Sequence, residues 1–300
     1  IQLGILAILS LLVILSLFIR DISWPEKAER RVEISVIVRE SDSSIWSEAR
    51  RGMAKAAADY GVELRFLALG ESNSVSEQTE LIRQEIKNGA DGLVVVPAQT
   101  EALEVIAKDN PKIPIVTMES SLEGSCISVK PDNVWIGEQL AAAIEEDFSE
   151  GHVLLVDAAP GSSGIRARLE AAEESLTEKG FTVLRCGSDF TVETIEGVDA
   201  VIFPEPESAV HALQLLDQNG KTSSLYVAGT EERILAGLEY GVIRGIVAWS
   251  GYGVGYQAVE QAASAVLGKE ISEPVVESVL VRKEEMYEIE NQKILFPIDH

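Results

Sequence analysis

The stretch RVEISVIVRESDSSIWSEARRGMAKAAADYG, residues 31–61, contains the pattern that decides the fold. An apolar run over residues 32–38 leads into a polar loop over residues 40–44. Apolar or large side chains then recur with the period of a helix that buries one face, at Trp46, Ala49, Met53, Ala57 and Tyr60. Gly61 is expected to end this helix, and a second β-type run over residues 62–68 follows at once. The stretch therefore predicts a β-loop-α-β unit, and open parallel sheets place ligands at the loop after such a strand.

The same alternation repeats along the chain in two successive halves. Further strands are expected at residues 93–96, 113–118, 127–129, 152–156, 181–185, 198–203, 225–228, 243–248 and 275–281. Helices are expected between them at residues 75–88, 100–109, 134–148, 165–179, 207–219, 231–240 and 254–267. Residues 187–197 are short for a parallel crossover, which needs about a dozen residues, so a stunted helix or a plain loop is expected there. This alternation predicts an α/β protein with two doubly wound parallel-sheet lobes.

Composition and charge narrow the range of functions. The 300 residues are 46% hydrophobic, and 49 acidic against 25 basic side chains give a formal net charge of −24. Such a charge argues against a nucleic-acid partner, whose phosphates would be repelled. Cys126 and Cys186 are too few for a disulfide framework and are interpreted as small buried hydrophobes. The three histidines show no metal-ligand spacing, so neither a metal nor a cofactor is expected.

The N-terminal segment, residues 1–19, contains no charge and would span roughly 28 Å as a helix, close to the thickness of a bilayer core. It is longer than the apolar core of a signal peptide, and no small-x-small cleavage site follows it. A transmembrane anchor or uncleaved signal is therefore predicted for residues 1–19, with Trp24 at the membrane interface. Residues 20–31 are interpreted as a linker.

Two glycine-rich stretches invite functional interpretations. In Gly251-Tyr-Gly253-Val-Gly255 the third glycine comes one place early for a dinucleotide motif, so a flexible joint is the favoured interpretation. Gly161-Ser-Ser-Gly164 leads into an expected helix. Its backbone N–H groups either hold an anion or polar ligand oxygen, or form an ordinary capped helix start. No G-x-S-x-G, H-E-x-x-H or P-loop motif occurs, so no catalytic residue is predicted and an enzyme is not expected.

An ordered series of segments carries a family resemblance. They are EISVIVRESDSSIW (33–46), EQTELIRQEIKNGADGLVVVPAQTEAL (77–103), KIPIVTMESS (112–121), ISVKPDNVWIGEQLA (127–141), HVLLVDAAPGSSGIRARLEA (152–171) and LYVAGTEERILAGLEYGVIRGIVAWSGYGVGYQAVE (225–260). In order and spacing, the chain from Val32 to Lys283 resembles the type I periplasmic binding proteins of the ribose and galactose kind. It also resembles the effector domains of lac-repressor-like regulators.

The resemblance implies two lobes that close on a ligand and are joined by three crossing hinge strands, near Pro131, Ser250 and Glu277. The N-terminal lobe would comprise residues 32–131 and 251–276. The C-terminal lobe would comprise residues 132–250 and 277–300.

The resemblance also implies ligand contacts, which fall on Ser43, Trp46, Glu119, Ser120, Arg166, Glu205, Thr230 and Trp249. Trp46 matches the aromatic residue that stacks on the sugar, and Arg166 matches an arginine at the start of a second-lobe helix. The other types differ, since Glu119-Ser120 replaces an aspartate-arginine pair and Trp249 replaces a hinge glutamine. Hinge packing is the alternative role for Trp249. A small sugar-like ligand with a stacking face and hydroxyl or amino groups is expected.

The implied function is extracytoplasmic solute binding for ABC-type import, with a permease as partner and a location at the cell membrane. The alternative is a sensing ectodomain that partners a membrane histidine kinase. A membrane segment stands where a repressor would have a helix-turn-helix, which disfavours a repressor.

Overall fold

The computed structural model describes residues 31–122, 127–271 and 274–296. The anchor predicted at residues 1–19, the linker up to residue 30 and Cys126 lie outside the described residues. Within the described ranges, no helix is long and apolar enough to cross a bilayer. The fold given below is that of the compact unit formed by residues 32–300.

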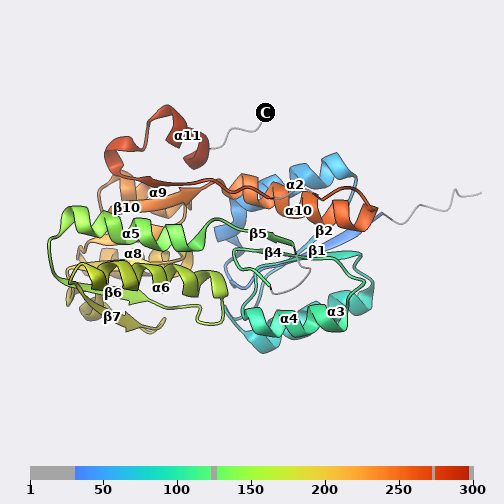
Figure 1. Ribbon diagram of the computed structural model, residues 1–300, viewed down its shortest axis with the longest axis horizontal. Coiled ribbons are helices and arrows are strands. Elements are labelled where there is room, and N and C mark those ends of the chain that lie inside the picture. The colour runs from blue at the N-terminus through green and yellow to red at the C-terminus, as the bar shows by residue number, and fades with distance from the viewer. Residues whose placement is uncertain (1–30, 123–126, 272–273, 297–300) are drawn as a thin grey trace, which may run out of the picture. The chain divides into compact units, whose positions relative to one another are not determined.

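Two separate sheets form the framework of this unit (Figure 1). The first sheet is entirely parallel and has the order β2-β1-β3-β4-β5. Its strands are β1 (Glu33–Ile37), β2 (Glu63–Leu67), β3 (Gly92–Val95), β4 (Ile115–Met118) and β5 (Ile127–Val129). The second sheet has the order β11-β10-β9-β8-β6-β7, in which only the edge strand β11 is antiparallel. Its strands are β6 (His152–Val156), β7 (Thr182–Cys186), β8 (Ala200–Phe203), β9 (Leu225–Ala228), β10 (Ile243–Trp249) and β11 (Ser278–Val281).

Helices cover both faces of each sheet. Around the first sheet are η1 (Ser43–Trp46), α2 (Ser47–Tyr60), α3 (Val75–Asn88), α4 (Thr100–Asp109) and α10 (Gly251–Leu267). Around the second sheet are α5 (Asn133–Asp147), α6 (Ser163–Glu178), α7 (Val192–Glu196), α8 (Pro206–Asn219), α9 (Glu232–Glu239), η2 (Lys283–Glu285) and α11 (Ile289–Leu295). Figure 1 shows α2 beside α10 and α5 beside α6, as their packing contacts require.

The buried residues follow the two-residue period of the strands. In β3 and the residue after it, Val94 and Val96 belong to a core shared with α2 and α10, whereas Leu93 and Val95 belong to a core shared with α3 and α4. The second sheet likewise has one core beneath α5 and α6 and another beneath α8 and α9. Four cores on two sheets confirm the predicted pair of doubly wound lobes.

The chain passes between the two sheets three times. It leaves β5 at Val129 and continues into α5, which packs on the second sheet. It leaves β10 at Trp249 and continues into α10, which packs on the first sheet. It returns after α10 and adds β11 to the second sheet. The lobe boundaries given above, at residues 131/132, 250/251 and 276/277, remain a proposal.

Local predictions hold where a backbone signal is strong. Gly61 ends α2 with φ of +68°, a left-handed conformation that glycine adopts without a Cβ clash. The short crossover contains the stunted helix α7. Cys186 lies half-buried against the core of its lobe.

The flexible joint predicted at residues 251–255 is wrong, because these residues form the first turns of α10. The glycines instead allow α10 to approach α2 closely. A Cβ on Gly255 would lie 2.0 Å from the Ala49 carbonyl oxygen, and a Cβ on Gly52 would lie 2.0 Å from the Tyr252 carbonyl oxygen. Helix packing therefore explains this glycine pattern.

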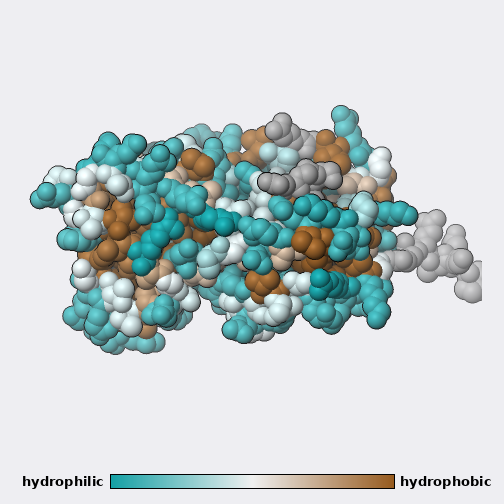
Figure 2. Space-filling view, turned by 60° about the horizontal axis from the view of Figure 1, so that its bottom comes forward, coloured by the Kyte–Doolittle hydropathy of each residue, from teal (hydrophilic) through white to brown (hydrophobic). Residues whose placement is uncertain are grey.

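Polar and apolar residues are both present at the surface of the unit. The face shown in Figure 2 is covered largely by hydrophilic residues, with hydrophobic patches between them.

Candidate functional site

A cavity of about 610 Å³ lies between the two lobes, beside the carboxyl ends of their strands. Residues that follow β1, β4 and β9 line it, together with the last residue of β10 and residues of α2, α9 and α11. The carboxyl edge of an open parallel sheet is where ligands bind in such folds, because the loops there diverge and leave a crevice. The volume suits a small molecule.

Glu119 is at the centre of the polar groups in this cavity. It follows β4 directly, is 8% exposed, and has a φ of +68°, which is uncommon for a residue with a side chain. Its carboxylate bonds to Arg39 of the same lobe and lies 3.4 Å from Nη1 of Arg168, which belongs to α6 of the other lobe. Burial alone would raise the pKa of Glu119, but the two guanidinium groups hold it below its ordinary value. Glu119 is therefore a buried anion that links the lobes.

The backbone of Glu119 also contacts the second lobe. Asn133 donates its Nδ2 to the Glu119 carbonyl oxygen at 2.7 Å, and accepts from Nε of Arg168 at 2.8 Å. Arg168 donates further to the carbonyl oxygen of Pro204 at 2.6 Å. These contacts fix the positions of both charged groups.

Glu40 and Trp46 form a second pair on the first lobe. Nε1 of Trp46 donates to Oε2 of Glu40 at 2.7 Å, while Oε1 of Glu40 lies 3.0 Å from Nη2 of Arg39. Burial raises the pKa of the Glu40 carboxyl to about 7, although Arg39 and the indole N–H partly oppose the shift. This hydrogen bond holds the indole N–H of Trp46, which is one of the residues that line the cavity.

The second lobe contributes two more carboxyl groups, one buried at Glu205 and one half-buried at Glu231. Glu205 follows β8 and caps α8, since Oε2 accepts from the Glu207 N–H at 2.6 Å and Oε1 from the Ser208 N–H at 3.0 Å. Glu231 follows β9, and its Oε2 is buried without a hydrogen-bond partner among the described residues. Burial raises the pKa of Glu231 well above its usual range, and Glu205, Glu40 and Glu119 add to that effect.

Trp249, the last residue of β10, forms part of the wall at the crossing between the lobes. The guanidinium carbon of Arg168 lies 4.9 Å from its ring centroid, within the range of a cation–π contact. Trp249 also packs against the cores of both lobes. It therefore packs between two cores and also has a place on the cavity wall.

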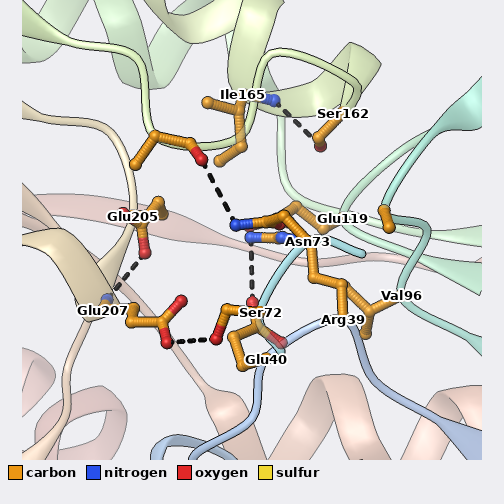
Figure 3. A network of polar contacts seen from close by, with 12 residues as sticks. Arg39, Glu40, Ser72, Asn73, Val96, Glu119, Ser162, Ile165, Glu205 and Glu207 are labelled. Carbon is orange, nitrogen blue, oxygen red and sulfur yellow. Dashed lines mark hydrogen bonds and ion pairs between the residues drawn. The ribbon is translucent and has the colours of Figure 1, made fainter. Parts of the chain in front are cut away.

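Direct contacts join the lobes on a side that includes the 161–164 loop. Ser72 donates to Oε1 of Glu207 at 2.6 Å, a contact visible in Figure 3 beside Arg39, Glu40, Glu119 and Glu205. The Thr100 N–H donates to the Gly161 carbonyl oxygen at 2.9 Å. The structure thus shows a form in which the lobes touch.

The 161–164 loop resolves the two interpretations of that motif. The Gly164 N–H donates to Oγ of Ser120 at 3.1 Å, and the Ser163 N–H donates to Oγ1 of Thr100 at 3.0 Å. Ser162 caps α6 through the Ile165 N–H. Protein groups therefore occupy these donors, and the loop is a capped helix start that joins the lobes.

The structure places the eight predicted contact residues in two groups. Those that line the cavity are Trp46, Glu119, Thr230 and Trp249. Glu205 lies buried at the start of α8, and Ser120 is buried in a hydrogen bond to Ser162 at 2.9 Å. Arg166 is directed to Glu101 at 3.1 Å and lies outside the cavity lining. Ser43 begins η1, and its side chain lies outside the described part of the structure.

Four charged residues of the site are additional to that set, namely Arg39, Glu40, Arg168 and Glu231. Arg168 had a detectable signal, since it lies three residues after Ile165 and four before Ala172 on the apolar face of α6. Arg39 and Glu40 lie in the segment that follows the buried strand β1. Glu231 lies in the segment that follows β9. The resemblance places an arginine at the position of Ser120, after β4. In this chain the guanidinium group comes instead from Arg39, after β1.

The comparisons with known proteins agree with this architecture. The chain belongs to the family described as periplasmic binding protein domain, whose model matches residues 34–270. Family membership implies an extracytoplasmic location.

Relatives and solved structures can be set beside the chain. The ribose import binding protein RbsB of Bacillus subtilis (strain 168) is 24% identical over 263 residues, which cover 82% of this chain and 86% of that protein. An ABC transporter solute-binding protein from Agrobacterium vitis, bound with alpha-D-tagatopyranose, has a TM-score of 0.78 at 17% identity, covering 89% of this chain and 100% of that one. A chain of the XylFII-LytSN complex has a TM-score of 0.73 at 16% identity, covering 85% and 98% respectively. At these identities the structural likeness shows the fold.

Proposed function

We propose that this chain is an extracytoplasmic solute-binding protein that holds a small, polar, sugar-like ligand in the cleft between its lobes. The observation that carries the proposal is the cavity of about 610 Å³ lined by two indole rings and by buried charged groups. A sugar ring offers an apolar face to Trp46 and hydroxyl groups to Glu119, Arg39 and Arg168. The names of the relatives, a ribose import binding protein and a tagatose-bound solute-binding protein, support this ligand class.

The proposed binding mode is closure of the lobes on the ligand. The ligand would touch residues after β1 and β4 from one lobe and residues after β9 from the other. The hydrogen bonds between Thr100 and Gly161 and between Ser72 and Glu207 would form on closure. A ligand that bridges both lobes stabilises the closed form because it binds that form more tightly.

The partner proposed for the loaded protein is an ABC-type permease, and its location is the outer side of the cell membrane. The N-terminal segment at residues 1–19 would hold the binding unit there, since it is uncharged and long enough to span a bilayer. The role as partner of a membrane histidine kinase remains the alternative. No catalytic step is part of the proposal.

A thermal-shift screen of the full chain tests the binding function. The panel contains pentoses, hexoses, amino sugars, nucleosides and polyols. At a ligand concentration of about 100 Kd the stabilisation is about 2.7 kcal/mol, which raises Tm by about 5 °C or more. No shift across the whole panel would overturn the proposal.

Paired tryptophan variants locate the site in the same screen. Trp46→Ala removes a cavity wall and is expected to abolish most of the shift. Trp135→Ala is the matched control, because Trp135 lies on α5, packs against a core and is absent from the cavity lining. Equal losses in both variants would place the ligand elsewhere.

A further inference from the structure

The charges of the cavity are unbalanced, and they indicate the kind of ligand. The lining contains six glutamates against three arginines, and among the described residues it contains no lysine or histidine. Glu40 and Glu119 are buried and pair with the guanidinium groups of Arg39 and Arg168, while half-buried Glu231 adds a buried carboxylate oxygen and the buried Glu205 lies outside the lining. Carboxyl groups thus outnumber guanidinium groups in the interior, and in the empty site this excess is offset where burial raises a pKa and keeps a proton on a carboxyl group, as at Glu231. A cationic ligand would supply the missing charge.

Two buried side-chain atoms of residues that line the cavity have unmet hydrogen-bonding capacity. Nη2 of Arg168 is buried without a partner among the described residues, on a side chain that is only 1% exposed. Oε2 of Glu231 is buried and equally unpartnered within the same part of the chain. A buried donor and a buried acceptor each carry a desolvation cost until a partner arrives. A ligand oxygen that accepts from Arg168 and a ligand donor that reaches the ionised Glu231 would each remove such a cost.

The aromatic walls suit a positive charge too. Trp46 donates its N–H to Glu40, which leaves the π faces of the indole for contact along the cavity. The negative face of an indole attracts an ammonium group. A carboxylate beside an indole therefore binds an amine better than either group alone.

We propose that the ligand of this cleft is a cationic polyhydroxylated amine, of the amino-sugar or amino-polyol class. Its ammonium group pairs with Glu231 near Glu40, and a hydroxyl oxygen accepts from Nη2 of Arg168. The inference rests on the proposed solute-binding function and narrows its ligand class. A protein that binds a neutral sugar would fulfil the proposed function but not this inference.

In the empty site the Glu231 carboxyl group holds a proton, and in the loaded site its carboxylate pairs with the ammonium group of the ligand. Burial and the carboxyl groups of Glu205, Glu40 and Glu119 raise the pKa of Glu231, while Arg39 and Arg168 are the positive groups that face the same interior. A cationic amine requires the ionised carboxylate, so binding releases protons and its affinity rises with pH while the amine remains charged. A neutral sugar has no such requirement.

Calorimetry on the full chain in detergent tests the inference with matched probes. D-glucosamine, D-galactosamine and D-mannosamine are each compared with the parent hexose and with the N-acetyl derivative at pH 7. At least one free amine is expected to bind about tenfold or more tightly than both of its neutral counterparts, because a buried charge pair supplies the difference. Proton release should appear as a dependence of the heat on the buffer.

The outcomes separate the inference from the function. If neutral hexoses bind as tightly as the amines, the proposal of a cationic ligand is overturned, whereas the proposal of sugar binding stands. Absence of tight binding by all three amines overturns the inference, while the wider sugar panel decides the function independently.

An isosteric variant identifies the group that recognises the charge. Glu231→Gln is expected to lower the affinity for the best amine about tenfold more than the affinity for its parent hexose, because only the amine loses a charge partner. Glu85→Gln is the control, since Glu85 is buried outside the cavity and bonds to Ser35 at 2.7 Å. Thermal melting verifies that each variant folds. An equal loss for amine and hexose in Glu231→Gln would contradict recognition of charge.

Discussion

Glu119 and Arg168 form a buried ion pair across the two lobes, with Oε1 of Glu119 3.4 Å from Nη1 of Arg168. Glu119 follows β4 in the first sheet and Arg168 lies on α6 beside the second. Because Glu119 also bonds to Arg39, which pairs with Glu40 as well, one carboxylate bridges two guanidinium groups at the centre of the cleft. This ion pair is therefore both part of the charge of the binding site and a contact that holds the two lobes together.

Removal of the Glu119 charge should destabilise the protein strongly. Glu119→Gln leaves Arg39 and Arg168 buried beside each other without their shared anion, at an expected cost of about 3 to 5 kcal/mol. Urea denaturation measures the change. Glu48→Gln is the control, because its ion pair with Arg51 is exposed and should be worth about 1 kcal/mol or less. Similar small effects in both variants would contradict a central role for Glu119.

The contact between the lobes at Gly164 should be needed for closure. A Cβ on Gly164 would lie 2.4 Å from the Glu119 carbonyl oxygen, so Gly164→Ala is expected to hold the lobes apart. Ligand affinity should fall about tenfold, because part of the binding energy is then spent on relieving the clash. Small-angle scattering should show a larger radius of gyration. Gly187→Ala is the control, since its nearest atom would be Oδ1 of Asp189 at 3.4 Å, and unchanged affinity in Gly164→Ala would refute the closure mode.

The glycines between α2 and α10 should affect stability rather than mobility. Gly255→Ala forces a Cβ to within 2.0 Å of the Ala49 carbonyl oxygen, which should cost about 1 to 3 kcal/mol by overpacking. The same helix provides a control in Gly251→Ala, whose Cβ would meet only Glu48 Cβ at 3.4 Å and the Ala49 nitrogen at 3.9 Å. Denaturant midpoints compare the two. A flexible joint at this place would instead make both variants neutral or stabilising.

Stability should fall as pH rises through the range in which Glu40 ionises. The folded pKa of Glu40 is about 7, above its ordinary value of 4.5, so the native state binds more protons than the unfolded state between these values. The free energy of unfolding of the empty protein should therefore decrease by about 3 kcal/mol from pH 4.5 to pH 7 on account of this group. Glu119, whose pKa is lowered, opposes this trend only at more acidic pH. Urea denaturation of the wild type and Glu40→Gln at several pH values tests this, and equal slopes would contradict it.

The architecture was predictable because its signals are local. Apolar runs such as residues 93–96 mark strands covered on both faces, and Gly61 marks a helix end whatever lies around it. The glycines at 251–255 were misinterpreted because their function is a contact with α2, some two hundred residues away. A sequence spacing does not reveal such a partner.

The site was predictable by region and only partly by residue. Trp46, Glu119, Thr230 and Trp249 directly end or follow strands, or belong to the loop after one, and the topology brings such positions together. Arg166 and Arg168 differ by two positions, which on a helix turns them to different faces. Only Arg168 faces the core, so the helical period of α6 would have distinguished the buried arginine from the exposed one.

Hydrogen–deuterium exchange with and without a ligand from the sugar panel tests the central claim most directly. Binding between the lobes predicts simultaneous protection of peptides that cover residues 39–49 and 118–120 of one lobe and residues 229–236 of the other, because both walls of the cavity close on the same molecule. The 161–164 loop, which joins the lobes through Thr100 and Ser120, should be protected in parallel. Protection confined to one lobe, or located away from the carboxyl ends of the strands, would contradict the account.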